Sequence, residues 1–168
     1  MDSFEIKDLL TVKGKPGLWK LVAWIPSSKM VRVKNLTNDD IVATVKGVDV
    51  AAINDYKIYL TNGEMSLENV FNFIMEMEEK GEVSTEELDS YEKLSEVKKT
   101  DMMKKLVPDY DENQFKHYHL TKIIKWYKEL VKALDMFEED QYKKEVDRQW
   151  NELDDSGLDE PLTEPIII

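Results

Sequence analysis

Short apolar runs of β-strand character occupy the first third of the chain. Four of them cover residues 18–25, 30–36, 41–45 and 56–60, and branched and aromatic side chains are frequent in each. Turn-forming residues separate the runs, and the strong turn dipeptide Asn62-Gly63 follows the last one. A flat sheet of such short strands would expose edges that invite aggregation. We therefore expect a small SH3-like β-barrel or a curled antiparallel sheet.

The first of these runs is apolar on both of its alternating faces. Trp19 and Leu21 fall on one face, whereas Leu18 and Val22 fall on the other. This pattern is typical of a strand that is covered on both sides. We expect the run to lie between the interior of the strand module and a helix.

Apolar positions at helical spacing replace the strand pattern after residue 63. The first helical stripe consists of Leu67, Val70, Phe71, Ile74 and Met77. The most regular stripe consists of Leu120, Ile123, Ile124, Tyr127, Leu130, Val131 and Leu134. The fold class predicted is therefore α+β, with a strand module over residues 1–63 followed by a helical module over residues 64–137.

The end of the chain is an acidic extension over residues 138–168. Tyr142, Val146 and Trp150 keep a thin helical stripe, which predicts a further helix over residues 139–153. The pattern is lost afterwards, and we expect the remainder to be a flexible tail.

Composition and charge narrow the classes of function. The 168 residues include no cysteine, which excludes disulfides and thiolate chemistry, and their formal net charge is −12. Residues 1–63 carry 9 basic and 7 acidic side chains, a net charge of +2, so the excess of acidic residues lies in residues 64–168. An acidic protein attracts nucleic acid poorly at long range. We expect a cytoplasmic protein without contact with a membrane, because the sequence shows neither a signal peptide nor an apolar stretch that could span a bilayer.

Two groups of motifs resemble those of a bacterial family. The first pairs GKPGLWKLV at residues 14–22 with DVAAINDYKIY at residues 49–59, and the second pairs LVPDYD at residues 106–111 with IIKWY at residues 123–127. On these motifs the chain resembles the DUF5606 family of uncharacterised proteins from Bacteroidetes. The resemblance implies a cytoplasmic bacterial protein with a β-rich module followed by a helical module, and it implies no activity.

Catalytic and metal-binding patterns are weak. His117 and His119 are the only histidines, and their spacing does not suit two metal ligands on one helix. Asp109, Asp111 and Glu112 supply nearby oxygens, but the glycine and glutamate of a calcium-binding loop are missing. Glycine-rich phosphate loops and nucleophile elbows are absent as well. We expect no enzyme activity, no metal and no cofactor.

Binding surfaces are the remaining hypothesis. Cations on the strand module beside aromatic rings would suit a single-stranded nucleic acid, whereas a large aromatic residue off the main helical stripe would suit a protein partner. The candidate surface residues are Lys20, Trp24, Arg32, Lys34, Tyr59 and Trp126. We expect a non-enzymatic protein-binding or adaptor module, and the alternative is an RNA- or DNA-binding factor. The partner is unknown, and the sequence leaves self-association open.

Overall fold

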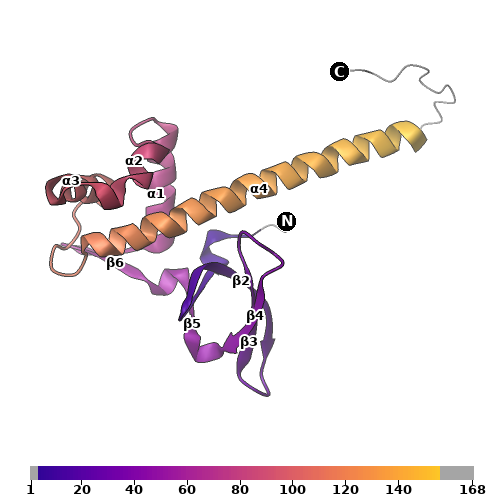
Figure 1. Ribbon diagram of the computed structural model, residues 1–168, viewed down its shortest axis with the longest axis horizontal. Coiled ribbons are helices and arrows are strands. Elements are labelled where there is room, and N and C mark those ends of the chain that lie inside the picture. The colour runs from indigo at the N-terminus through magenta and orange to yellow at the C-terminus, as the bar shows by residue number, and fades with distance from the viewer. Residues whose placement is uncertain (1–3, 156–168) are drawn as a thin grey trace.

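The computed structural model describes residues 4–155, with side chains to residue 151, and its fold is α+β as expected (Figure 1). The strands are β1 (Leu10–Val12), β2 (Lys15–Ile25), β3 (Met30–Asn35), β4 (Val42–Lys46), β5 (Val50–Ala52), β6 (Lys57–Leu60) and β7 (Gly63–Ser66). The α-helices are α1 (Leu67–Glu79), α2 (Thr85–Asp89), α3 (Glu96–Leu106) and α4 (His117–Asp155). Short 3₁₀ turns are η1 (Ile6–Asp8), η2 (Gly47–Asp49), η3 (Ile53–Asp55) and η4 (Tyr91–Lys93).

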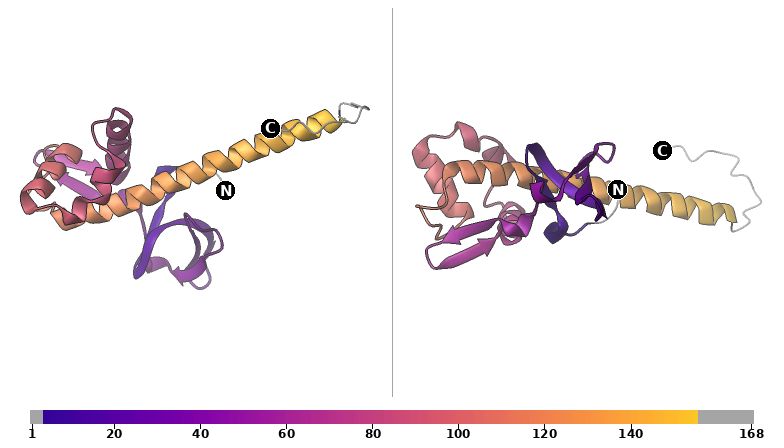
Figure 2. Two further views of the ribbon diagram at one scale, coloured as in Figure 1. Left: turned by 45° about the horizontal axis from the view of Figure 1, so that its top comes forward. Right: turned by 90° about the horizontal axis from the view of Figure 1, so that it is seen from below.

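The first five strands form one antiparallel sheet in the order β4-β3-β2-β1-β5. The sheet curls so that its two edge strands, β4 and β5, approach each other through the single turn η2 (Figures 1 and 2). In the described residues these edges do not pair, so the sheet is not closed. This confirms the curled antiparallel sheet and not the closed barrel.

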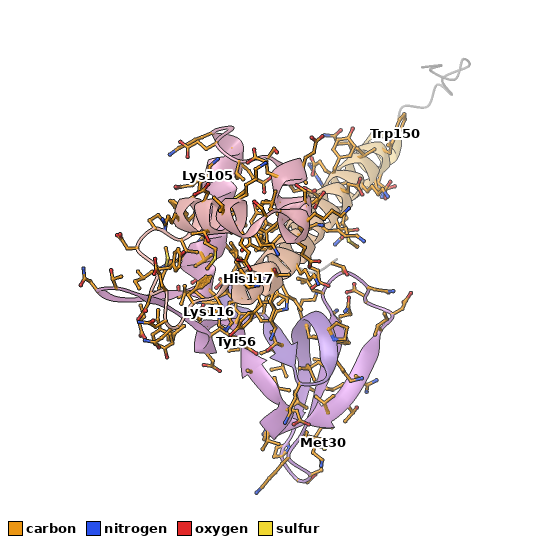
Figure 3. All side chains as sticks on the ribbon, turned by 60° about the vertical axis from the view of Figure 1, so that its left-hand side comes forward. Met30, Tyr56, Lys105, Lys116, His117 and Trp150 are labelled. Atoms are coloured by element: carbon orange, nitrogen blue, oxygen red, sulfur yellow. The ribbon has the colours of Figure 1, made fainter. Side chains whose placement is uncertain are left out.

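Strand β2 is covered on both sides, but only over part of its length. Leu18, Trp19 and Lys20 are buried, whereas every residue from Leu21 to Ile25 is exposed. The pairing with β3 shifts between Leu21 and Ala23, which is a β-bulge. Beyond the bulge the β2–β3 hairpin extends away from the helices, and Met30 marks its far end in Figure 3. The second half of β2 therefore departs from the expectation of a strand covered on both sides.

The predicted strand module places β6 in one sheet with the preceding strands. In the structure, β6 does not join the five-stranded sheet. It pairs with β7 in a separate hairpin closed by Asn62-Gly63, in register Lys57↔Ser66 and Leu60↔Gly63. The turn dipeptide was recognised from the sequence, but the short strand behind it was not. The predicted boundary at residue 63 consequently falls inside this hairpin.

Two apolar cores share strand β2. The small core lies inside the curl of the sheet and contains Val12, Trp19, Val31 and Val33. The large core lies between the helices and the outer side of the sheet. It takes Leu9, Leu18, Leu36, Ile53 and Ile58 from the first part of the chain, together with the apolar stripes of α1 and α4.

Helix α4 is one uninterrupted element of 39 residues. The sequence predicts two helices here, one ending near residue 137 and one over residues 139–153. They merge because no glycine or proline lies between residues 117 and 155 to end the first. The first half of α4 packs in the large core, and the second half runs clear of the fold (Figures 1 and 2). The tail expected from residue 154 onward lies almost entirely outside the described residues.

Candidate functional site

The three predicted cations of the strand module share the outer face of the sheet. Lys20 is paired with Lys34 across β2 and β3, and Arg32 occupies the next outward position of β3. Lys20, however, is only 8% exposed. Its Nζ lies 3.9 Å from Asp39 Oδ1 and 6.0 Å from the centre of the Phe4 ring.

Asp39 reduces the positive charge of this face. Its Oδ1 lies 3.9 Å from Nζ of Lys20 and 4.0 Å from Nζ of Lys34, so that one carboxylate faces both ammonium groups. Arg32 is exposed on the same face. The outer face is therefore less basic than the sequence of β2 and β3 indicates.

Trp24 lies on the opposite face from these cations. It pairs with Val31, which belongs to the small core, so its ring is at the rim of the curl. A Cβ atom at Gly47 would lie 2.9 Å from a Trp24 ring carbon, which shows that the ring covers this glycine. The predicted combination of Trp24 with Lys20, Arg32 and Lys34 on one surface does not form.

Exposed apolar side chains lie on the distal part of β2 and at the start of β4. We call them the sheet patch, which consists of Leu21, Val22, Trp24, Ile25, Ile41 and Val42. Their exposed fractions run from 36% for Ile25 to 56% for Leu21. These residues do not share one face, because Trp24 pairs with Val31 on the inner side, whereas Val42 pairs with Lys34 on the outer side. Exposed large apolar residues are nevertheless frequent at protein–protein contact sites.

Strand β4 adds an open edge to the sheet patch. Within the described residues it pairs only with β3 and stands at the end of the strand order. Its free side presents backbone donors and acceptors beside exposed Ile41 and Val42. An edge of this kind is the geometry to which an extended peptide adds as a further strand.

Tyr59 and Trp126 lie elsewhere. Tyr59 is 43% exposed on β6, in the two-stranded sheet. Trp126 is 7% exposed and lies where the sheet meets α4, so it is a packing residue between the two parts of the fold. Its ring forms an edge-to-face contact with Tyr56 at a centroid distance of 5.2 Å.

Two hollows flank this aromatic pair. One, of about 360 Å³, reaches towards β6 and the start of α4, and the other, of about 570 Å³, reaches towards the β1–β2 turn. Lys122 lines both hollows, with its Nζ 5.0 Å from the centre of the Trp126 ring and 5.7 Å from that of Tyr56. The ammonium group thus stands over the rings and limits stacking of a flat ligand on them.

A half-buried carboxylate fixes α4 to the sheet beside these hollows. Oε2 of Glu129 accepts a hydrogen bond of 2.8 Å from the Leu18 backbone N–H. Burial raises the pKa of the Glu129 carboxyl, while the Leu18 N–H and the charge of Lys132 act in the opposite direction. Gly17 lies next to it with a φ of +91°, which favours glycine, and a Cβ atom there would lie 2.8 Å from Oε1 of Glu129, so that the carboxylate would have to shift.

The two histidines lie in the first turn of α4, and His119 caps it. Nδ1 of His119 accepts a hydrogen bond of 2.9 Å from the Lys116 backbone N–H, which is one half of a capping box. Burial and the charges of Lys122 and Lys116 lower the pKa of His119. Among residues 4–155 no three His, Asp or Glu side chains are grouped so as to hold a metal ion.

The sheet patch was missed by sequence reasoning, except for Trp24. The signal was present, since residues 21–25 are apolar on both faces, and this was interpreted as burial on both sides. A strand that extends past the core into solvent can be apolar on both faces as well. The contact between Gly47 and the Trp24 ring could not be predicted from the sequence.

Comparison with known proteins corrects the family resemblance. Residues 57–130 match DUF6852, a domain of unknown function, and not DUF5606. The match begins at β6 and ends within α4. No curated protein matches the sequence significantly.

A solved structure is similar to the fold. It is a solution NMR structure of a structural genomics target from Bacteroides vulgatus, with 25% sequence identity and a TM-score of 0.57. The similarity covers 77% of this chain and 87% of that chain. None of the helices in residues 4–155 has the length and apolar character needed to cross a membrane.

Proposed function

We propose that the protein is a non-enzymatic binding module of the cytoplasm that recognises a partner protein through the edge of strand β4. In this proposal the curled sheet acts as an SH3-like recognition module, and an extended segment of the partner adds to β4 as a sixth strand. The observation that supports it is the open edge of β4 next to exposed Ile41 and Val42.

The partner segment has a defined chemistry. Backbone hydrogen bonds to β4 would provide affinity, and alternate side chains of the segment would meet the apolar residues Ile41 and Val42. Exposed Arg32 on the neighbouring strand and Lys46 at the end of β4 favour acidic residues at the flanking positions.

Site-specific photo-crosslinking in native cells tests the proposal. A photoreactive residue at Thr44, exposed on β4, should capture a protein, whereas the same residue at Lys104, exposed on α3, should not. Binding of the captured protein is then measured by calorimetry. We expect Val42→Lys to weaken it at least about tenfold, which corresponds to 1.4 kcal/mol.

The matched control is Val97→Lys, because Val97 is an equally apolar side chain, 72% exposed, on α3. It should leave the affinity unchanged within about twofold. Crosslinks to nucleic acid whose retention falls steeply with salt would replace the proposal by the nucleic-acid alternative. Turnover of a metabolite by the purified protein would contradict both.

A further inference from the structure

Among residues 4–155, the second half of α4 runs clear of the other helices and strands (Figures 1 and 2). Side chains from residue 138 to residue 151 are exposed or half-buried. Two large aromatic residues lie on it, Tyr142 with 72% and Trp150 with 52% of the side chain exposed. Isolated helices of this length are marginal in water, so a partner surface would stabilise both the helix and its aromatic residues.

The aromatic residues define one side of this helical arm, by which we mean residues 138–150. Tyr142, Val146 and Trp150 recur every four residues and therefore form one stripe. Glu139 and Asp147 flank the stripe, and in the described residues neither forms a salt bridge. The acidic side chains of the arm number five and the basic ones three, a net charge of −2.

The first half of α4 carries a groove with the opposite charge. The groove has a volume of about 530 Å³ and lies between α4 and the start of β2, with Pro16, Gly17 and Trp126 among its lining residues. Lys122, Lys125, Lys128 and Lys132 line it with Glu129, a net charge of +3. Lys125 and Lys128 already form salt bridges with Glu92 and Asp89. Among residues 4–155, Lys122 and Lys132 have no such partner.

We propose that two copies of this chain form an antiparallel, two-fold symmetric dimer in which the arm of each copy lies in the lysine groove of the other. The arm cannot reach the groove of its own chain, because both belong to one straight helix. From Lys128 in the groove to Val146 in the arm, the helix rises about 27 Å at 1.5 Å per residue. When a second copy lies antiparallel to the first, the arm of each copy lies opposite the groove of the other.

The spacing of charges sets the register. With the two-fold axis beside Asp135, Lys132 of one copy falls within one residue of Glu139 of the other, and Lys122 falls within one residue of Asp147. The stripe of Tyr142, Val146 and Trp150 then meets the groove, where the methylene groups of the lysines cover its apolar floor. Each copy contributes one arm and one groove, so the interface is isologous and closed.

Analytical ultracentrifugation of the full chain tests the dimer, and charge exchange tests its register. We expect Lys132→Glu and Glu139→Lys each to raise the dimer dissociation constant at least about tenfold, and the double variant to restore it to within about threefold. The control is Lys104→Glu, on exposed α3, which should have no effect. Circular dichroism shows whether each variant keeps its helix content.

Crosslinking gives an independent measurement, because the chain contains no cysteine. Asp135→Cys should be joined to its copy by a short bismaleimide reagent, whereas Val97→Cys should not. A monomer at every concentration, or a dimer that Tyr142→Ser with Trp150→Ser leaves unchanged, would overturn the proposal. Failure here leaves the β4 proposal untouched, since the two use different surfaces and different assays.

Discussion

The Glu129 carboxylate accepts the Leu18 backbone N–H at 2.8 Å, across 111 residues of sequence. This bond joins α4 to β2 at the point where the chain enters both cores. We expect Glu129→Ala to lower the free energy of unfolding by about 1–3 kcal/mol, because it leaves a partly buried N–H without an acceptor. Urea denaturation measures the loss. Glu92→Ala, which removes an exposed salt bridge, should cost less than about 1 kcal/mol.

Gly17 should tolerate no side chain, for two separable reasons. Its φ of +91° is strained for any other residue, and an added Cβ atom would approach Glu129 Oε1 to 2.8 Å. Gly14 has a similar φ of +79° with no atom within 4 Å of such a Cβ. We therefore expect Gly17→Ala to lower thermal stability more than Gly14→Ala does, and the difference measures the contact with Glu129. If the two variants lost the same thermal stability, the Glu129 side chain would move away from the added methyl group at no cost.

Trp126 should matter for stability far more than Trp24. Trp126 is 7% exposed and packs edge-to-face on Tyr56, whereas Trp24 is 52% exposed. Trp126→Ala is expected to cost about 3–5 kcal/mol of unfolding free energy. Trp24→Ala, the same change at the rim of the curl, should cost at most about 1.5 kcal/mol. Chemical denaturation with matched m-values distinguishes the two.

His119 should make the protein less stable in acid. Its pKa is lowered in the fold, so its neutral form is favoured, and Nδ1 must be unprotonated to accept the Lys116 N–H. This contribution is complete above the ordinary pKa of 6.5 and is lost as the pH falls through the lowered value. His119→Gln keeps an acceptor that does not titrate. As the pH decreases below 6.5, the wild-type protein should therefore lose more free energy of unfolding than the His119→Gln variant. A difference between them that does not change with pH would exclude His119 as the cause of the lower stability in acid.

Local signals predicted the elements of this fold well. Runs of branched and aromatic residues located β2, β3 and β4, the Asn62-Gly63 dipeptide located a hairpin turn, and the apolar stripes located α1 and α4. Each of these features depends on neighbours in sequence, and propensity and periodicity describe such neighbours directly. The α+β class followed from their order.

Long-range relationships could not be predicted in the same way. No residue near Glu129 in sequence indicates that its carboxylate accepts a hydrogen bond from Leu18. Likewise, no residue near Lys20 indicates that its ammonium group lies close to Asp39. The bulge between Leu21 and Ala23 depends on pairing with β3, so the change from buried to exposed positions within one strand was invisible. For this reason the six predicted surface residues are divided among the outer sheet face, the rim, the β6–β7 hairpin and a packing contact.

The position of Leu18 and Trp19 has a consequence for cutting the protein into fragments. These adjacent residues belong to different cores, and one peptide bond therefore connects the interior of the curl with the interior of the helices. A fragment limited to residues 57–130 would lose Leu9, Leu18, Leu36 and Ile53, and its remaining helices would expose the surfaces that these side chains cover. We therefore expect the range that matches DUF6852 not to fold by itself, and we expect the strands and helices of the whole chain to unfold in a single cooperative step.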